Sequence, residues 1–442
     1  MRERFAACYE LPAFSLHRAA GVLTEQLARL DQWHVTVADA GDFCHQVEEL
    51  LRCAAPILVD LAARAGAEPG LPTGGPAEIQ ARVLRGWPWR WPDMAAQRVL
   101  VVGAGVTGLL TAVRCAAAGH RVVVLDRGPV PNPAATSFDQ HRALRALHVD
   151  DPATTAAAAT ARRRWSVLEG ELGERFRRPV GVVTAVPADA VARSLALAAD
   201  AGVGLSVPAP GAFAPVAFPD HGVALFEPDG GVLLAERVLR AAVRWLSHHP
   251  LVELRPWQPV VDVDTAAPAV TTARGERLRG DVLLVAAGPW SRALVDVPTT
   301  LYRQTVVYLR PPEDLADWWE TAPCVGGAGP DGRSWLVPPG AGTDLKTSTA
   351  AACRAVGSLD DPDDPDHWAD VVLRAGALAD PDRYRVVAAR TCHYAVDAAT
   401  GAGALTRVGP AAWARAASGG DGFRTAPLVA DHIADALAAV PA

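Results

Sequence analysis

The sequence predicts an α/β protein with more than one domain, and three observations support this prediction. The chain has 442 residues, which is more than one hydrophobic core usually organises. A short apolar run, "VLVV" at 99–102, is followed at once by a glycine-rich turn and a helical pattern. From residue 98 onward, strand-like and helix-like segments alternate, which is typical of sheets covered by helices.

Residues 1–97 have a different pattern from the rest of the chain. Apolar residues recur at helical spacing over 22–33 and 39–66, so we expect two or three helices there. The segment "RGWPWRWPD" (85–93) is broken by prolines and is expected to be a linker. We therefore predict a helical N-terminal extension over 1–97, which could cover an active site, form a dimer interface or dock a partner.

The composition indicates a soluble globular protein. Apolar residues make up 50% of the chain, and the net charge of −7 gives no general attraction to nucleic acid or to an anionic membrane. Neither a signal-peptide pattern nor an apolar run of membrane-spanning length is visible, so we expect a cytoplasmic protein. The seven cysteines are scattered without a C-x-x-C pair, and we expect free thiols and no metal site.

Three glycines form a G-x-G-x-x-G pattern directly after the first predicted strand. Gly103 allows the tight turn, Gly105 lets the backbone approach a diphosphate, and Gly108 lets helix and strand pack closely. A helix over about 106–118 would direct its positive N-terminus at the phosphates. The next predicted strand ends at Asp126, where a carboxylate binds ribose hydroxyls. The pattern predicts a dinucleotide site without distinguishing NAD from FAD.

Four further segments follow in a fixed order: "TSFDQHRALRAL" (136–147), "ALFEPDGGVLLAERVLRAAVRWL" (224–246), "DVLLVAAGPWSRAL" (281–294) and "ASGGDGFRTAPLVADHIADAL" (417–437). Together with the glycine pattern they resemble the FAD-dependent amine oxidases of the D-amino-acid oxidase superfamily, and within it the monomeric sarcosine oxidase branch. The resemblance spans about 98–440 and leaves the first 97 residues unexplained.

The resemblance implies two discontinuous domains behind the helical extension. One is a FAD-binding domain of Rossmann type, similar to glutathione reductase, built from 98–180, 221–300 and 395–442. The other is a substrate domain with a mixed β-sheet, built from 181–220 and 301–394, in which "YRQTVVYLRP" (302–311) is one strand.

Further FAD contacts are implied by the resemblance. In chain order they are Arg127, Ser137, Arg142, Gly288, Gly420, Gly422 and Phe423. The last three belong to "GGDGF" (419–423), a turn before an apolar helix whose dipole would stabilise negative charge at the flavin N1–C2=O locus. The alternative is an ordinary helix N-terminus, capped by Ser418 or Asp421.

The resemblance also implies a covalent bond from Cys392, in "ARTCHYAVDA" (388–397), to the flavin 8α-methyl group. A thioether requires a thiolate, which a nearby cation would favour; Arg390 and His393 are the candidates. The alternative role for Cys392 is that of a small buried residue on a strand.

Two arginines stand at the positions where the branch holds a substrate carboxylate, Arg145 and Arg424. A guanidinium presents a fork that matches a carboxylate and orients it. We expect Arg142 and Arg145 on one helical face at i, i+3, with Arg142 nearer the FAD. The alternative for each is a solvated or ion-paired surface arginine.

Lys346 is the single lysine of the chain, because every other basic residue is an arginine. The segment "WLVPPGAGTDLKTS" (335–348) resembles the family's strand–loop–strand, whose lysine activates dioxygen. A compact ammonium gives a fixed positive charge beside the developing negative charge, and arginine does not replace it conservatively. The alternative is an isolated surface lysine.

Two departures from the sarcosine-specific members make sarcosine itself doubtful. Their histidine after the lysine is replaced by "TSTA" (347–350), and their histidine in the segment beneath the flavin is replaced by Phe138. Tyr394 is assigned to the catalytic site with Lys346, and Asp139 and Trp335 are further candidates for the pocket wall.

The predicted reaction is oxidation of a secondary amine, an N-methyl or a cyclic amino acid. Hydride leaves the carbon next to nitrogen for flavin N5, an imine forms, and O₂ returns the flavin to its oxidised state with release of H₂O₂. The neutral amine reacts, so no strong base is required. One alternative is a flavin oxidase of secondary metabolism that desaturates a cyclic amino acid derivative, with a carrier protein as partner. The others are a D-amino-acid dehydrogenase with a non-O₂ acceptor and, remotely, a flavin-binding scaffold without activity.

Overall fold

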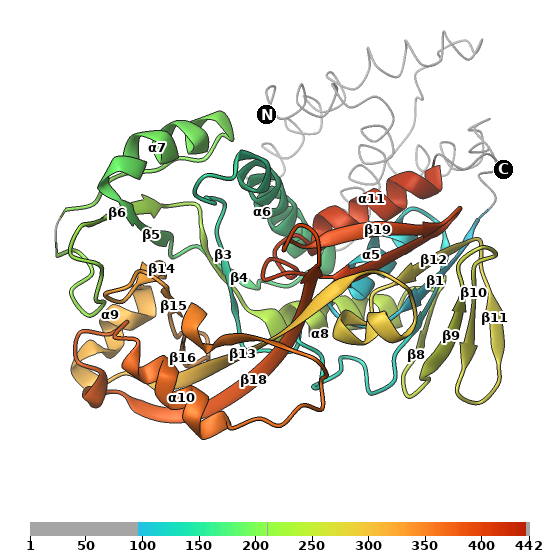
Figure 1. Cartoon of the computed structure of the whole chain (residues 1–442). Helices are drawn as coiled ribbons and strands as arrows, with labels where there is room; N and C mark the ends of the chain where they lie inside the picture. Colours follow the sequence, from blue (N-terminus) through green and yellow to red (C-terminus); the bar gives the residue numbers. More distant parts are fainter. Residues whose placement is uncertain (1–95, 210, 439–442) are drawn as a thin grey trace, which may run out of the picture. The chain divides into compact units, whose positions relative to one another are not determined.

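The computed structural model describes residues 96–209 and 211–438, and the account below concerns this part of the chain. The predicted helices of the N-terminal extension lie outside the described residues. Figure 1 shows two large sheets, and the long strands β13 (Thr299–Arg310) and β18 (Arg385–Asp397) run side by side from one to the other. Among the described helices, none is long and apolar enough to cross a membrane.

The first sheet has six strands in the order β19-β20-β12-β1-β2-β8. It is parallel except at its β19 edge. The strands are β1 (Arg98–Val102), β2 (Arg121–Leu125), β8 (Val252–Arg255), β12 (Val282–Val285), β19 (Ala404–Gly409) and β20 (Ala412–Ala417). The central strands are almost wholly apolar, as expected for a parallel sheet covered on both faces. The predicted strands before Gly103 and Asp126 are confirmed.

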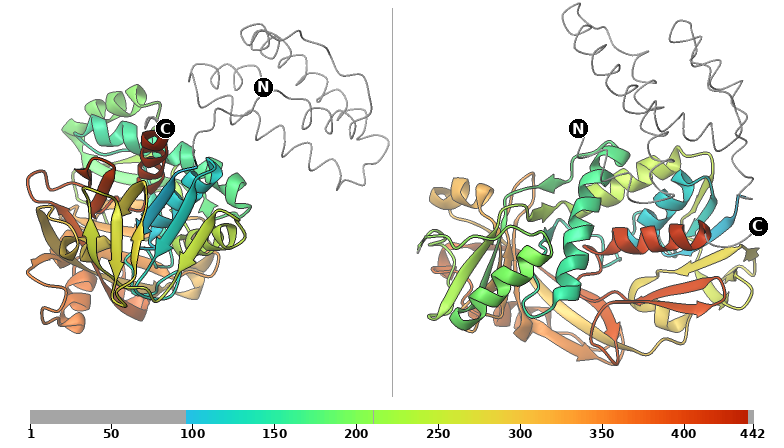
Figure 2. Two further views of the ribbon diagram at one scale, coloured as in Figure 1. Left: turned by 90° about the vertical axis from the view of Figure 1, so that its right-hand side faces the viewer. Right: turned by 90° about the horizontal axis from the view of Figure 1, so that it is seen from above.

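The two faces of the six-stranded sheet have different covers, and alternate residues of β1 point to each. Val99 and Val101 pack with α5 (Val106–Ala117), α8 (Ala235–Ser247) and α11 (Ala426–Ala438). Leu100 and Val102 pack with a three-stranded sheet that lies on the opposite face (Figures 1 and 2). That sheet consists of β9 (Val260–Asp264), β10 (Ala269–Thr272) and β11 (Arg277–Arg279).

The second large sheet has eight strands in the order β17-β13-β16-β15-β14-β5-β6, with β18 also paired to β13. It is mixed, because β5 and β14 are parallel and the other neighbours are antiparallel. The strands not yet introduced are β5 (Val182–Pro187), β6 (Gly222–Glu227), β14 (Cys324–Ala328), β15 (Ser334–Val337), β16 (Leu345–Thr349) and β17 (Cys353–Val356). The mixed sheet and the strand expected over 302–311 are as predicted. β6 belongs to this sheet, although its residues fall within 221–300, the range expected in the FAD-binding domain.

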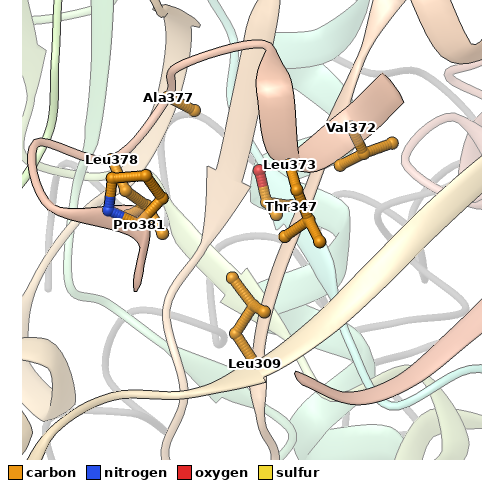
Figure 3. Close-up of a pocket in the computed structure, with 7 residues that line it drawn as sticks. All are labelled: Leu309, Thr347, Val372, Leu373, Ala377, Leu378 and Pro381. Atoms are coloured by element: carbon orange, nitrogen blue, oxygen red, sulfur yellow. The ribbon is translucent and has the colours of Figure 1, made fainter. Parts of the chain in front are cut away.

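The outer face of this sheet is covered by α10 (Pro365–Arg374) and α9 (Ala316–Thr321), which form a separate apolar core. Figure 3 shows the seven residues around a gap in this core, among them Leu309, Thr347 and Val372. The gap has a volume of about 10 Å³, no more than one water molecule needs, so it is a packing defect and not a ligand site.

The remaining elements connect these layers. A small sheet joins β3 (Arg142–Leu144), β7 (Gly231–Leu233) and β4 (Arg177–Arg178), and two helices complete the fold, α6 (Pro152–Leu172) and α7 (Val191–Asp200). Short 3₁₀ turns lie at Ala188–Ala190, Gly288–Ala293, Glu313–Leu315, Ala350–Ala352 and Pro381–Arg383.

The prediction of one helical face for Arg142 and Arg145 is wrong. Arg142 begins β3, which pairs antiparallel with β7, and Arg145 follows its end. An extended backbone does not bring residues i and i+3 onto one face. The apolar segment Gly231–Leu233, about ninety residues further along the chain, offers ladder hydrogen bonds that the local sequence pattern does not reveal.

Candidate active site

A cavity of about 720 Å³ lies between the six-stranded and eight-stranded sheets, within the usual size range of ligand sites. Nearly all residues that the sequence assigned to the site line this cavity. They are Gly103, Gly105, Asp126, Arg127, Ser137, Arg142, Arg145, Gly288, Lys346, Cys392, Tyr394, Gly420, Gly422, Phe423 and Arg424. Gly108 is the exception, because it lies one turn into α5 against the turn itself. Asp139 and Trp335 also line the cavity, whereas Phe138 is absent from its wall.

The backbone of the glycine turn packs closely against the backbone of neighbouring segments. Gly103 has φ +104°, and a Cβ there would clash with the carbonyl oxygen of Ala286 at the end of β12. A Cβ on Gly108 would clash with the carbonyl oxygen of Gly103, so only glycine allows α5 to begin this close to β1. Gly105 is the N-cap of α5 and faces the cavity. The turn therefore leaves open a cradle at a helix N-terminus, which fits a diphosphate.

Asp126 is buried directly after β2, and both oxygens of its carboxylate accept hydrogen bonds. Oδ2 accepts from the backbone N–H of Ala104 at 2.8 Å, and Oδ1 accepts from Gly128 N at 2.9 Å and Asn132 Nδ2 at 2.8 Å. Ser137 Oγ accepts from Val106 N at 3.1 Å, at the first turn of α5. These groups fix a carboxylate and a hydroxyl on the cavity wall beside the glycine turn, as a bound dinucleotide requires.

Lys346 is 2% exposed, so it is not a surface lysine. From β16 its Nζ donates to Asp139 Oδ2 at 2.9 Å and to the carbonyl oxygen of His141 at 2.7 Å. Asp139 also pairs with Arg142 and accepts from the Tyr308 hydroxyl at 2.5 Å. Two cations therefore share one carboxylate, which leaves this buried cluster with a net charge of +1.

Burial holds the pKa of Lys346 well below its ordinary value, and Arg142 lowers it further. The carboxylate of Asp139 at 2.9 Å acts in the opposite direction, because it favours the ammonium form. Arg142 is itself fixed by donation to the carbonyl oxygen of Thr136 at 2.6 Å, and its guanidinium carbon lies 5.9 Å from the ring centre of Phe423.

Arg145 and Arg424 meet at another part of the cavity wall. Burial lowers the pKa of Arg424 to about 9, and the charge of Arg145 contributes, so the two guanidinium groups lie within electrostatic range of each other. Arg424 pairs with Asp421, three residues before it. Among the residues that the structure describes, Arg145 has no hydrogen bond or ion pair, and its donors remain available.

His148 lies beside these two arginines and was not singled out by the sequence. Its Nε2 is 3.0 Å from Asp421 Oδ2, and its Nδ1 is 2.9 Å from the carbonyl oxygen of Ala146. Burial, followed by Arg145 and Arg424, lowers its pKa to about 4. The carboxylate of Asp421 and the carbonyl oxygen of Ala146 act in the opposite direction, because both oxygens accept hydrogen bonds and only the protonated ring can donate from both nitrogens.

Cys392 lies on β18 with its Sγ 3.5 Å from the carbonyl oxygen of Gln304. Strand alternation puts Arg390 on the same side as Cys392 and His393 on the other. His393 Nε2 accepts from Arg303 Nε at 2.9 Å, away from the cavity wall. Burial lowers the pKa of Arg142, and a negative charge on Cys392 raises it. Arg142 and Cys392 therefore lie within electrostatic range of each other.

Tyr394 follows two residues later on the same side of β18. Its hydroxyl is 3.1 Å from Cys353 Sγ, its ring stacks on Tyr302 at 5.7 Å, and burial raises its pKa. A raised pKa keeps the phenol protonated, so Tyr394 can donate or accept a hydrogen bond but does not act as a phenolate.

Two further residues at this site were missed by the sequence reasoning, Tyr308 and Arg415. Tyr308 had no visible signal, because only the pairing of β13 with β16 brings it to Asp139. Arg415 had a visible signal in the sequence, because it is the sole charged residue of the otherwise apolar segment "AAWARAAS" (411–418) before the second glycine-rich turn.

Residues 98–436 match the sequence profile of a family described as FAD dependent oxidoreductase. The chain belongs to this family. The glycine cradle, the held carboxylate of Asp126 and the large cavity next to them fit the FAD of the FAD dependent oxidoreductases.

Relatives of this chain include the peroxisomal sarcosine oxidase of Mus musculus, which is 25% identical over 236 residues. That match covers 49% of this chain and 59% of the relative. The monomeric sarcosine oxidase of Bacillus sp. (strain NS-129) is 27% identical over 226 residues, 47% of this chain and 57% of the relative. The matches therefore span a little under three-fifths of the length of these relatives.

Solved structures with the same fold include Amadoriase I, a fructosyl amine:oxygen oxidoreductase of Aspergillus fumigatus. It has a TM-score of 0.61 at 17% identity and covers 77% of this chain and 86% of its own. A variant of NikD, an unusual amino acid oxidase essential for nikkomycin biosynthesis, has a TM-score of 0.62 at 19% identity over 78% of this chain and 94% of its own. At these identities the likeness shows the fold alone.

Proposed function

We propose that this protein is a FAD-dependent oxidase of a secondary amine, an N-methyl or a cyclic amino acid that carries a carboxylate. The observation that carries the proposal is that one cavity extends from the glycine turn to three cationic side chains, Arg145, Arg424 and Lys346. The curated and structural relatives are named for sarcosine, fructosyl amines and an amino acid, and all of these substrates are amines.

FAD supplies, when bound, an acceptor for hydride at flavin N5 and passes the electrons to O₂ with formation of H₂O₂. The residues that would hold it are the glycine turn, Asp126 and the second glycine-rich turn at 419–423. Cys392 would supply the covalent bond, and Arg142 lies close to it on the cavity wall.

The substrate carboxylate is assigned to Arg145 and Arg424. Arg145 has its donors free among the described residues, and it lies close enough to Arg424 to lower the pKa of that residue. Asp421 neutralises part of the charge on Arg424, while the charge of Glu227 offsets that of Arg145 only in part. A carboxylate at this point would reduce the repulsion between the two guanidinium groups and would orient the amine.

The same cations favour the neutral form of a bound amine. Lys346, Arg142, Arg145 and Arg424 all line the cavity, against the carboxylates of Asp139 and Asp421 in this half of the wall. An excess of positive charge lowers the pKa of an ammonium held among these residues. The amine then has the lone pair that hydride loss requires, and no catalytic base is needed to deprotonate it.

The segment after Lys346 differs from that of the sarcosine-specific members. Thr347, Ser348 and Thr349 are buried in β16, and the Ser348 hydroxyl donates to the carbonyl oxygen of Thr305 at 2.5 Å. These small side chains stand where sarcosine-specific members carry a histidine, but none of the three lines the cavity, and Thr347 faces the separate apolar core beneath α10.

The test is an anaerobic screen in which N-methyl, cyclic and D-amino acids are mixed with the protein and loss of the oxidised flavin absorbance is followed. At least one carboxylated amine should bleach the flavin, and its decarboxylated analogue should not. If no amine bleaches it, the proposed function is wrong. Admitting air to the bleached protein should give one H₂O₂ per turnover; an absence of peroxide would favour the dehydrogenase alternative.

The carboxylate assignment has its own test with the amine that the screen identifies. Loss of one charged hydrogen-bonding partner is expected to raise KM in Arg145→Met by about 10- to 100-fold. Arg240→Met is the matched control, because Arg240 is exposed on α8, pairs with Glu236 and is absent from the cavity wall. An unchanged KM in Arg145→Met would remove Arg145 from the substrate site.

A further inference from the structure

Arg415 is a buried cation on the wall of the cavity that the function described above does not use. It lies on β20 and is 8% exposed. Its neighbours on the strand alternate between the two faces of the sheet. Ala414 and Ala416 pack toward the three-stranded sheet, and Trp413 packs toward the helices α5 and α11. Arg415 therefore points to the helix side, where the N-terminus of α5 and the glycine turn also line the cavity.

The guanidinium of Arg415 is almost without partners. Nη2 donates to Thr425 Oγ1 at 3.2 Å, and Nε is buried without a hydrogen bond. No carboxylate lies within ion-pair distance of it in the described ranges. Only one of the five N–H donors of this side chain is thus used.

The other two arginines that are buried in the described part of the chain are compensated. Arg162 pairs with Glu227 at 2.5 Å, and Arg303 donates to backbone carbonyl oxygens of the 359–362 segment and lies 3.6 Å from Asp363. Arg415 differs from both, because burial alone lowers its pKa, to about 10, and no carboxylate raises it. It is still charged at neutral pH, and an unpaired buried charge is strongly unfavourable.

The charge of Arg415 is also separate from the substrate wall. Arg145 and Arg424 affect each other and His148, whereas no charged group contributes to the pKa shift of Arg415. The partner that compensates Arg415 must therefore enter the cavity from elsewhere and must be an anion. Bound FAD brings anionic oxygens into this cavity, on its diphosphate and, after reduction, at the N1–C2=O edge of the ring.

We propose that Arg415 is a FAD-binding residue, which donates through its unused N–H groups to an anionic oxygen of the cofactor. Gly403 leaves room for this arrangement, because a Cβ there would stand 3.1 Å from Arg415 Nη2. The contact rests on the FAD of the family and not on amine oxidation, so it stands even if no amine substrate is found.

The test compares Arg415→Met with Arg415→Lys, and with Arg407→Met as control. Arg407 is an exposed arginine on the adjacent strand β19, outside the cavity wall. All variants are made in the full chain with Cys392→Ser, so that FAD exchanges freely. Melting temperatures are measured without and with FAD, dissociation constants are measured for FAD and for ADP, and midpoint potentials are measured by spectroelectrochemical titration. None of these readouts requires turnover.

The proposal predicts that the effect of Arg415→Met on the melting temperature depends on whether FAD is bound. Without FAD, Arg415→Met should melt at the same temperature as the parent or higher, because an unpaired buried charge has been removed. With FAD, the gain in melting temperature should shrink. If the contact is to the diphosphate, the dissociation constants for FAD and ADP should both rise by about 10- to 100-fold. If it is to the reduced ring, ADP binding should stay unchanged and the midpoint potential should fall, by about 30 mV for each tenfold loss.

Arg415→Lys retains the charge and should recover part of either effect, while Arg407→Met should change none of these quantities. The proposal is overturned if Arg415→Met melts lower without FAD and binds FAD and ADP like the parent at an unchanged potential. That result would give Arg415 a structural role only. The same conclusion would follow if Arg415→Met cannot fold without FAD while Arg415→Lys binds FAD with the affinity and midpoint potential of the parent.

Discussion

Replacing Lys346 with methionine removes one positive charge from the interior while keeping the length and apolar stem of the side chain. The fold should tolerate the change, because Asp139 would still accept from Arg142, from the Tyr308 hydroxyl and from Gln140 N at 2.7 Å. The carbonyl oxygen of His141 would still accept from Arg142 Nη1 at 3.0 Å. The net charge of the cluster would fall from +1 to zero.

The size of the effect follows from that change in charge. A unit charge about 4 Å from a developing negative charge contributes about 4 kcal/mol at an effective dielectric constant of about 20. Each 1.36 kcal/mol changes a rate about tenfold, so this contribution corresponds to nearly 10³-fold. We expect the reaction of the reduced enzyme with O₂ to slow by about 10²- to 10³-fold in Lys346→Met. Anaerobic reduction by the amine should slow much less, because Arg145 and Arg424 still hold the substrate and, with Arg142, still favour the neutral amine.

Stopped-flow absorbance measures the two half-reactions separately, first with amine under argon and then with O₂ after reduction. Lys346→Arg is the matched variant: it restores the charge in a larger, planar group and should recover part of the O₂ rate. Circular dichroism confirms that each variant is folded. An unchanged O₂ rate in Lys346→Met, or an equal loss in both half-reactions, would refute the role of this ammonium in oxygen activation.

Two further predictions concern the cofactor and the turn that receives it. The acid-precipitated parent protein should stay yellow, and Cys392→Ser should release its flavin into the supernatant; a colourless parent precipitate would exclude the covalent bond. Gly108→Ala should lower the free energy of unfolding by about 3 kcal/mol, because its Cβ would clash with the carbonyl oxygen of Gly103. The control Gly170→Ala, at an exposed position of α6 where a Cβ meets nothing within 4 Å, should stabilise the protein by about 0.5–1 kcal/mol. Urea melts that rank the two variants in the opposite order would contradict the close packing of α5 on the turn.

The sequence by itself determined the features whose causes are local. The need for glycine at 108 follows from its contact with Gly103 five residues earlier, and the strands on either side of the turn follow from uninterrupted apolar runs. Lys346 stood out in the sequence because it is the single lysine among many arginines. Nearly all residues that were assigned from the motifs and their order line one cavity in the structure.

The tertiary structure decided what depends on residues far apart in the chain. Asp139 and Lys346 are separated by 207 positions, and His148 and Asp421 by 273, so no local pattern could predict their contacts. Arg142 lies in a strand instead of a helix because a distant segment supplies its ladder partner. The sequence shows that Arg415 is an arginine in an apolar strand, but only the packing around it shows that a buried charge has been left without an anion. Ion pairs and strand pairing are set by spatial neighbours, whereas turns and apolar runs are set by chain neighbours, and this difference separates what the sequence alone could predict from what required the fold.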